Sequence, residues 1–516
     1  MNWYFSAGDL NFFWQEQLRS LSWLPQVLRK DMGLGTSGLL SLWLDYPFRI
    51  VIKLLSVFGL SWFFIEKLLW LSVFLTGMYA SYKLAKFILG KSPYVYLTPF
   101  IYVANTYFLL LFSGGQLGVA WAYAYAPIVL QKFIESFDLS KKINLRRIII
   151  NGLFLALLMI LDLRIAYLVF GVVALYIFVI KKSRLVLSLI GSLFIAASIH
   201  LFWILPTVFA SSGVSEKGEQ FTNPGMLKFL SFADFSHALS LLHPNWPENL
   251  FGKVYFFQPE FLIIPILAFS AIFVRDQKVR FFALLAIIGA FFAKGVNDPA
   301  GAVFQWMFTY VPGFVMFRDP TKFYIYVAIA YSILIPAFFA RINKTIVLII
   351  FVLFWILTVR GIHVSIHNLP TEYVRLKDIL VSDMNPSRTL WIPTNENFAY
   401  SSDIHPLIAS SDIVSMQMLY NDGVRYVIVP EDSNKRIFLN NYTFDPQMRS
   451  DLIASLSATP LKRDERFKEL AVFENNNFNM QTTIPVNVAK QQKLANIGTA
   501  VSLVFLVGWV IAIKFL

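Results

Sequence analysis

The chain has no cysteine, and only 15% of its 516 residues are charged. Without cysteine there can be no disulfide bond, thiolate metal site or cysteine nucleophile. Soluble proteins usually carry about 25% charged residues, so the low charge content argues against a water-soluble multidomain enzyme. The sequence also lacks a Gly-rich phosphate loop, a zinc-ligand spacing and a Gly-x-Ser-x-Gly elbow. The common motifs of soluble enzymes are therefore missing.

Apolar residues dominate instead. They make up 57% of the chain, and 51 Phe, 22 Tyr and 13 Trp are too much apolar surface for a disordered protein. A spanning helix needs about 20 mostly apolar residues. Eleven stretches come close to this length: 62–85, 93–113, 118–136, 148–162, 163–180, 185–205, 259–274, 281–294, 323–340, 345–360 and 497–514. The stretch 38–60 is interrupted by charges and Pro47, which favours an interfacial or re-entrant helix.

The net charge of +13 has a definite placement. Five short connections between the predicted spans hold fifteen Lys and Arg, against only Asp138 and Asp276. These cations are Lys83, Lys86, Lys91, Lys141, Lys142, Arg146, Arg147, Lys181, Lys182, Arg184, Arg275, Lys278, Arg280, Arg341 and Lys344. All five connections fall on one face, which the positive-inside rule makes cytoplasmic. The basic excess therefore orients the chain, and a nucleic-acid partner is not expected.

The opposite, extracytoplasmic face receives the long segments. These are the N-terminal loop 1–61, the loops 206–258 and 295–322 of the transmembrane domain 62–360, and the polar segment 361–495. Within 361–495, strand-like runs at 389–392 and 424–429 and a helical pattern at 447–458 predict a small external α/β domain. The last helix, in 496–516, ends on the cytoplasmic side. The predicted fold is an all-α polytopic membrane protein with this external domain.

Asp9 stands beside Leu10, Phe12, Phe13 and Trp14 in the N-terminal loop. A carboxylate partly desolvated by aromatic neighbours has a raised pKa and can accept a proton from a hydroxyl near neutral pH. Asp9 is therefore a candidate general base or metal ligand. The alternative is a helix N-cap within an interfacial aromatic belt. Further acidic candidates in the same loop are Glu16, Asp31 and Asp45.

Arg318 and Lys322 precede the ninth predicted span and are expected on the outer surface at headgroup depth. Arg binds phosphate through a planar fork and Lys as a point charge, so the pair could hold a lipid-linked phosphate. The alternative is that both are ordinary snorkelling residues. Between them, Asp319 followed by Pro320 is typical of a helix N-cap with Pro at the first helical position.

Asp162 and Arg164 are predicted at the tip of an external hairpin between two spans. Charged residues avoid the middle of the predicted spans, whereas transporters place ionisable groups or broken helices near the midplane. This pattern counts against transport. His200 lies inside a predicted span, and the favoured interpretation is a neutral histidine hydrogen-bonded between helices.

Together these residues resemble the GT-C class of integral-membrane glycosyltransferases, and most closely the arabinofuranosyltransferase-like and YfhO-like membrane proteins. The matching features follow one another along nearly the whole chain. They are Gly8-Asp9, Gly33-Leu34-Gly35-Thr36, Phe317-Arg318-Asp319-Pro320-Thr321-Lys322-Phe323, and Gly423-Val424-Arg425-Tyr426-Val427-Ile428-Val429.

The resemblance implies transfer of a sugar from a polyprenyl-phosphate donor to a glycan, lipid or protein acceptor on the extracytoplasmic face. It implies that Asp9 is the base and that Arg318 and Lys322 bind the departing phosphate, in a single inverting displacement. Asp162, Arg164, Asp319, Glu16 and Asp31 would line the site. Carboxylates near phosphate are compatible with a divalent metal and equally with none, so both stay open. Two other functions stay open: a lipid or oligosaccharide translocator, and a non-catalytic assembly protein of cell-envelope glycan synthesis.

Overall fold

The computed structural model describes residues 3–6, 8–33, 38–139, 144–180, 185–210, 224–240, 262–274, 276–342, 345–360, 366–392, 397–410, 415–430, 446–479 and 486–516. The chain divides into two compact units. The α/β unit comprises Met1–Leu68, Phe202–Ser211 and Ser365–Thr499. The helical unit comprises Leu69–Leu201, Ser212–Val364 and Ala500–Leu516.

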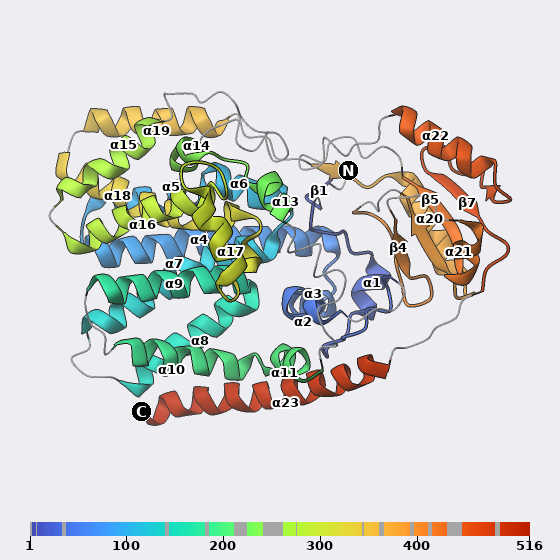
Figure 1. The fold of residues 1–516 in the computed structure, drawn as a ribbon, viewed down its shortest axis with the longest axis horizontal. Helices are drawn as coiled ribbons and strands as arrows, with labels where there is room; N and C mark the ends of the chain where they lie inside the picture. The colour runs from blue at the N-terminus through green and yellow to red at the C-terminus, as the bar shows by residue number, and fades with distance from the viewer. Residues whose placement is uncertain are drawn as a thin grey trace. The chain divides into compact units, whose positions relative to one another are not determined.

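Helices α4 (Trp62–Leu89) and α23 (Val486–Phe515) contribute residues to both units (Figure 1). The other elements of the helical unit are mostly apolar helices. They are η1 (Pro93–Tyr96), α5 (Leu97–Val103), α6 (Thr106–Ser113), α7 (Leu117–Leu139), α8 (Leu145–Leu161), α9 (Leu163–Val179), α10 (Leu185–Ile199), α13 (Pro224–Leu230), α14 (Phe235–Ser240), α15 (Ile263–Ser270), η4 (Ala271–Phe273), α16 (Gln277–Ala293), α17 (Gly301–Tyr310), η5 (Phe314–Phe317), η6 (Pro320–Phe323), α18 (Tyr324–Ile342) and α19 (Thr345–Arg360).

Helix α18 forms the centre of the helical unit. It is buried over almost its whole length and packs against α16, α5 and α15. The approach of α16 depends on Gly289, because a Cβ there would lie 2.6 Å from the Cβ of Tyr326. Gly152 has the same role between α8 and α10, where a Cβ would meet Ile195 at 2.7 Å. Small residues let apolar helices pack backbone to backbone, as is common in membrane proteins.

Helix is present in the described part of each of the eleven predicted spans, but most of these helices are shorter than a full span. Five are long and apolar enough to cross a membrane: Trp62–Leu89, Pro93–Ser113, Leu117–Phe137, Pro320–Ile342 and Val488–Phe515. A sixth is possible if Leu185–Ile199 and Leu201–Ala210, which are bent by 83°, form one broken span. The membrane class is therefore supported, whereas eleven complete spans are not confirmed.

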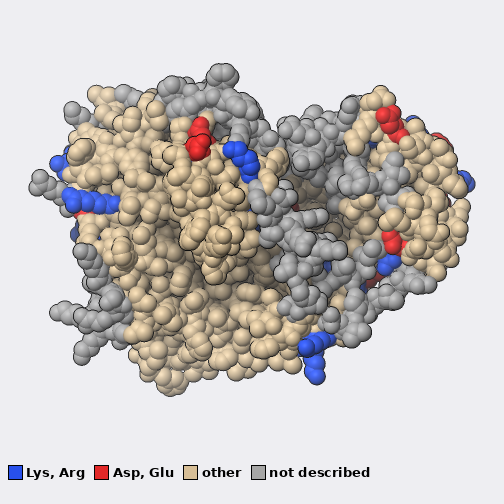
Figure 2. All heavy atoms as spheres, in the orientation of Figure 1, with Lys and Arg blue, Asp and Glu red and all other residues tan. Residues whose placement is uncertain are grey.

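On the face that Figure 2 shows, the described surface of the helical unit is largely uncharged. Exposed apolar side chains recur on one face of α10, for example Leu187 at 64% and Phe194 at 64% exposure. On α23, Val504 and Val507 are 71% and 57% exposed. Such a surface is unfavourable in water and favourable against lipid tails.

Three of the five basic connections come together at one end of the helical unit. The Nζ of Lys278, in the first turn of α16, lies 4.8 Å from the ring of Phe87 near the end of α4. Arg341, in the last turn of α18, donates from Nη1 to the carbonyl of Phe273 at 3.0 Å. Three of the predicted basic connections therefore meet. Of the fifteen Lys and Arg in all five connections, seven lie outside the described residues: Lys141, Lys142, Lys181, Lys182, Arg184, Arg275 and Lys344.

One predicted span, 93–113, is interrupted in its middle, which the hydropathy pattern did not predict. Helix α5 ends at Val103, and Asn105 caps α6 by accepting from Phe108 N at 2.9 Å. The Asn105 Nδ2 donates to the carbonyl of Tyr102 at 2.7 Å, and Trp355 Nε1 donates to the carbonyl of Ala104. Protein groups thus satisfy these backbone atoms inside the bundle, as the absence of water there requires.

In its described residues, the α/β unit contains two sheets and several short helices. Its elements are β1 (Trp3–Tyr4), α1 (Gln15–Ser20), α2 (Leu39–Leu44), α3 (Tyr46–Val57), α11 (Leu201–Ala210), β2 (His367–Asn368), α20 (Thr371–Ser382), β3 (Arg388–Trp391), β4 (Leu407–Ala409), α21 (Met416–Asn421), β5 (Val424–Val429), α22 (Pro446–Ser457), β6 (Lys462–Arg463) and β7 (Ala471–Glu474). The predicted strands at 389–392 and 424–429 and the helix at 447–458 are confirmed as β3, β5 and α22.

The larger sheet has the order β4-β3-β5-β7-β6, with β3 parallel to both β4 and β5. Strands β5 and β7, and β7 and β6, are antiparallel. Side chains alternate along β3. Leu390 joins a core with Leu419 of α21 and Leu456 of α22, whereas Trp391 stacks on Tyr373 of α20. The sheet therefore has helices on both faces.

The N-terminal segment belongs to the α/β unit through backbone pairing. Strand β1 pairs antiparallel with β2, and Met32 forms a parallel bridge with Leu407 at the edge of the larger sheet. The predicted interfacial helix at 38–60 is two helices, α2 and α3, separated at Asp45. The last residues of this region are exposed and apolar, with Val57 at 63% and Phe58 at 74%.

Candidate functional site

Lys322, which is buried, and Asp319, which is half-buried, form an ion pair just before the start of α18. Asp319 caps η6 by accepting from Thr321 N at 3.0 Å, with Pro320 at the first helical position as predicted. Lys322 Nζ donates to Asp319 Oδ2 at 2.6 Å and to Gln116 Oε1 at 3.1 Å. The lysine side chain is only 3% exposed, so it does not lie on the outer surface as expected. It is not an ordinary snorkelling residue.

A second ion pair lies at the tip of the α8–α9 hairpin. Asp162 accepts from the backbone N–H groups of Arg164 at 2.8 Å and Ile165 at 3.1 Å, and so caps α9. Arg164 donates from Nη2 to Asp162 Oδ2 at 2.7 Å and from Nε at 3.2 Å. The carboxylate is 2% exposed and the guanidinium side chain 26% exposed. One edge of the pair is therefore accessible.

The two ion pairs lie near each other. Arg164 is close enough to Asp319 for their charges to interact, and Tyr107 of α6 interacts electrostatically with both carboxylates. Burial raises the pKa of Asp319, but the charge of Lys322 and hydrogen bonds from Lys322 and Thr321 outweigh this, so its pKa lies below the usual value. We call Gln116, Asp162, Arg164, Asp319 and Lys322 the polar cluster.

The polar cluster lies at the opposite end of the helical unit from the basic connections. Helix α18 begins beside Lys322 and ends with Arg341 in its last turn. A helix of its 19 residues is about 28 Å long, close to the hydrocarbon thickness of a bilayer. Helix α8 likewise begins at Leu145 beside the basic connection and ends next to Asp162. Two separate helices thus place the polar cluster and the basic end about one bilayer apart.

Arg318, the other predicted phosphate ligand, directly follows η5 and is half-buried. It neighbours the polar cluster in sequence. The structure thus brings together four of the predicted residues, Asp162, Arg164, Asp319 and Lys322. They come from segments more than 150 residues apart. Gln116, which completes the cluster, was not predicted, because a single glutamine after Gly114-Gly115 has no recognisable signal.

Asp9 belongs to the α/β unit, whereas the polar cluster belongs to the helical unit. It lies in a turn with Gly8, whose φ of +56° is in the left-handed region, and its side chain is exposed. The aromatic neighbours do not cover it. Phe12 and Trp14 are buried and pack against each other with ring centroids 5.0 Å apart. The expectation of a carboxylate desolvated by these rings is therefore wrong.

Glu16 and Asp31, also in the α/β unit, have structural partners. Glu16 Oε1 lies 3.5 Å from Nζ of Lys377 on α20. Burial raises the pKa of Asp31, but the charges of Arg29 and Arg49 outweigh it, so its pKa is lowered. The Asp31 carbonyl also accepts from Leu407 N at 3.0 Å. The Glu16 carboxylate thus contacts α20, the Asp31 carboxylate pairs with Arg29 at 3.2 Å within the N-terminal segment, and the Asp31 backbone carbonyl joins that segment to the larger sheet. Residues 34–36 of the Gly33-Leu34-Gly35-Thr36 feature lie outside the described residues.

An Asp–His pair near the polar cluster was missed from the sequence. Asp234 Oδ1 lies 2.7 Å from His237 Nδ1 in the first turn of α14, and the histidine side chain is 3% exposed. Burial raises the pKa of Asp234, but its hydrogen bonds with His237 and Ser236 lower it well below the usual value. Tyr324 interacts electrostatically with both Asp234 and Asp319. The Asp-x-x-His spacing could have revealed this pair.

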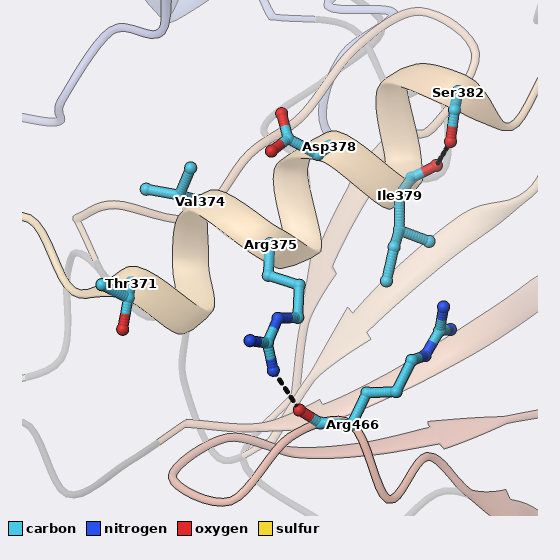
Figure 3. Close-up of a pocket in the computed structure, with 7 residues that line it drawn as sticks. All are labelled: Thr371, Val374, Arg375, Asp378, Ile379, Ser382 and Arg466. Carbon is cyan, nitrogen blue, oxygen red and sulfur yellow. Dashed lines mark hydrogen bonds between the residues drawn. The ribbon is translucent and has the colours of Figure 1, made fainter.

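A different depression lies on the α/β unit (Figure 3). It has a volume of about 520 Å³ and is open to solvent. Its lining comes from α20 and the segment before β7: Thr371, Val374, Arg375, Asp378, Ile379, Ser382 and Arg466. Arg375 donates to the Arg466 carbonyl, and the guanidinium of Arg466 is paired with Asp464 at 2.6 Å. Its arginines therefore already have partners.

His200 has the surroundings that were predicted for it. It is 1% exposed, and its Nε2 lies 3.0 Å from the carbonyl of Ala156 on α8. Among the described residues, no group of three or more His, Asp or Glu side chains is arranged to hold a metal ion.

A comparison with protein-family models found no family that matches the chain. A search of curated proteins likewise found no significant match.

Proposed function

We propose that this protein is a membrane glycosyltransferase of the GT-C type that transfers a sugar from a polyprenyl-phosphate donor to an acceptor on the extracytoplasmic face. The observation that carries the proposal is the polar cluster. It holds two cations, Arg164 and Lys322, at one end of an apolar helical unit. A lipid-linked phosphate has the same two parts, an anionic head beside a long apolar chain, and Arg and Lys are the usual phosphate ligands.

Arg164, Arg318 and Lys322 would stabilise the phosphate as it leaves. The acceptor hydroxyl forms a new bond to the anomeric carbon, and the bond from that carbon to the phosphate oxygen breaks. The departing phosphate keeps the electron pair, so negative charge develops where the cations lie. In the resting protein Arg164 and Lys322 are paired with Asp162 and Asp319. The phosphate must therefore compete with these carboxylates.

The proton of the acceptor hydroxyl must go to a base. Asp319 is a poor choice, because Lys322 holds its pKa low, and Asp162 is held by the guanidinium of Arg164. By resemblance to the GT-C class the base is Asp9. Its exposed side chain is a weaker base than a desolvated one, unless bound substrate covers it. If a divalent metal takes part, Asp162 and Asp319 are the carboxylates of the polar cluster that would hold it, and it would supply positive charge for the departing phosphate.

The proposed orientation places the polar cluster, the α/β unit and the long loops outside and the C-terminus in the cytoplasm. The support is the basic end of the helical unit, since Lys and Arg accumulate on the cytoplasmic side. The loop predicted at 206–258 falls largely on residues outside the described ones, 211–223 and 241–261.

The test is turnover of polyprenyl-phosphate sugars by the purified protein in lipid vesicles, with wild type and four variants. We expect Lys322→Met and Arg164→Met each to lower turnover about 100-fold, as loss of one charge-stabilising group does elsewhere. Asp9→Asn should abolish turnover. Lys278→Met, at the basic end, is the matched control and should remain active. Full activity of both cluster variants would disprove the phosphate site, and an active Asp9→Asn would disprove the base.

A lipid or oligosaccharide translocator is the second candidate. The break at Ala104–Asn105 favours it, because broken helices near the membrane centre line the substrate sites of many transporters. Against it, the groups at this break already bond to one another. Movement of a fluorescent polyprenyl-phosphate lipid between leaflets of vesicles, without sugar transfer, would favour the translocator. Neither activity would favour a non-catalytic assembly protein.

A further inference from the structure

A run of nineteen residues, 299–317, contains no charged side chain. It includes α17, a helix of ten residues, which is about 15 Å long and too short to cross a bilayer of about 30 Å. Asp298 precedes the run, and Arg318 and Asp319 follow it. Helix α17 is therefore an uncharged segment of the helical unit that is flanked on both sides by charged residues.

One face of α17 is part of the protein core. Phe304 is 1% exposed and Phe308 is 8% exposed. The ring of Phe304 lies 5.2 Å from that of Phe314 and 6.3 Å from that of Phe292 on α16. These contacts fix the rotation of the helix about its own axis, so the side chains that remain outside are determined.

The outward side of α17 carries two different stripes. Val303, Trp306 and Tyr310 are 44%, 58% and 69% exposed, and the rings of Trp306 and Tyr310 are 5.9 Å apart. Gln305 and Thr309, also exposed, form a second stripe beside them. The positions 303, 306 and 310 recur at helical spacing and so lie on one line of the helix surface.

The aromatic stripe lies at the same end of the helical unit as the polar cluster. Tyr167, one turn after Arg164 on α9, donates from its hydroxyl to the carbonyl of Pro312 at 3.3 Å. The Tyr167 ring is also 5.6 Å from that of Phe317. The segment after α17 is therefore attached to the helix that carries Arg164.

We propose that α17 lies flat in the membrane–water interface, with Trp306 and Tyr310 inserted among lipid headgroups and Gln305 and Thr309 facing water. Trp and Tyr concentrate at this depth because an apolar ring and a polar N–H or O–H can each find a suitable environment. The partner is the interfacial region of the bilayer itself. Because the segment is uncharged, its insertion does not depend on anionic lipid. The inference is independent of the sugar-transfer reaction.

The absence of native cysteine allows a clean test. Single cysteines at Trp306 and Tyr310, and matched controls at Gln305 and Thr309, receive a nitroxide spin label. The protein is placed in vesicles of phosphatidylcholine alone and of phosphatidylcholine with phosphatidylglycerol. Collision with oxygen, which concentrates in lipid, is compared with collision with a water-soluble nickel chelate.

We expect labels at 306 and 310 to collide mainly with oxygen and labels at 305 and 309 mainly with nickel, equally in both lipids. Equal nickel access at all four positions would overturn the inference, as would a signal that appears only with phosphatidylglycerol. Spin–spin broadening or disulfide formation between two copies at 306 would show a protein interface instead. All four positions are exposed, so the substitutions should not disturb folding. If one variant nevertheless fails to fold, at least one position on each stripe remains for the comparison.

Discussion

At the scale of single residues, the polar cluster depends on charges that neutralise each other. Lys322 is almost fully buried, and its two bonds to Asp319 and Gln116 replace the water it loses. An isolated ammonium group would be very costly to bury, so Lys322 can be buried only because Asp319 is its partner. A bound phosphate would add a second negative partner to Lys322. The pair is therefore suited both to stabilise the fold and to exchange one anion for another.

The lowered pKa of Asp319 predicts acid sensitivity. A carboxyl whose pKa is lower in the folded state stabilises the fold above its unfolded pKa of about 3.9, and this contribution is lost as the pH falls toward the folded value. Wild type should therefore lose stability more steeply than Asp319→Asn as the pH is lowered from neutral through this range. The measurement is thermal unfolding in detergent as a function of pH. Asp403→Asn, at an exposed position, should follow wild type; a wild-type slope in Asp319→Asn would contradict the ion pair.

Glu372 predicts a large effect within the α/β unit. Its carboxylate, only 8% exposed as a residue, accepts from the backbone N–H groups of residues 468, 469 and 470 at 2.7 to 2.8 Å. Glu372→Ala leaves three donors without this acceptor, and the expected loss is about 3 kcal/mol of unfolding free energy. Amide hydrogen exchange of the full chain should accelerate at 468–470 in particular. Exchange there should stay slow in Glu465→Ala, an exposed neighbour; unchanged exchange in Glu372→Ala would refute the role.

At the scale of helices and strands, local signals were sufficient for some elements. Asp319-Pro320 predicted a helix start because the cap and the first turn involve adjacent residues. Strand β5 was predicted because turn residues bound a β-branched run. The break at Ala104–Asn105 was not, since an apolar window does not reveal that one asparagine can cap a helix when Trp355 supplies a partner from far along the chain.

The same distinction holds for the candidate site. Residue type and position identified Asp162, Arg164, Asp319 and Lys322, but not their pairing, because that depends on how α8, α9 and α18 pack. Asp9 shows the opposite case. Its aromatic neighbours in sequence suggested desolvation, yet their rings turn into the α/β unit and leave the carboxylate exposed.

The helix break allows a comparison between two asparagine caps. Asn105 is 1% exposed and accepts from Phe108 N, while Asn144 is exposed and accepts from Arg147 N at 3.2 Å. Asn144→Ala should cost about 1 kcal/mol, the usual value of an N-cap. Asn105→Ala also leaves buried backbone carbonyls without a hydrogen-bond donor, so we expect it to lower the unfolding free energy by about 3 kcal/mol. Thermal unfolding in detergent measures both; similar small losses would mean that the break is not maintained by Asn105.

At the scale of the whole molecule, charge and length agree on an orientation. Three of the basic connections meet at one end of the helical unit, the polar cluster lies at the other, and α18 covers the distance between them. This separation matters more than the number of spans, because an apolar helix of only 17 residues such as α9 still places Arg164 at the end of the helical unit opposite the basic connections.

This orientation makes a labelling prediction. Cysteine is introduced into the cysteine-free chain at Gln277, beside the basic end, at Asp403 in the α/β unit, and at Thr309 of α17, all exposed positions. A membrane-impermeant maleimide added to intact cells should label positions 403 and 309 at once, and position 277 only after permeabilisation. The reason is that each Lys or Arg carried across the membrane would cost free energy, which fifteen of them make prohibitive. Labelling of position 277 alone in intact cells would show that the chain has the opposite orientation. The polar cluster would then lie in the cytoplasmic leaflet, where sugar transfer to an external acceptor is impossible.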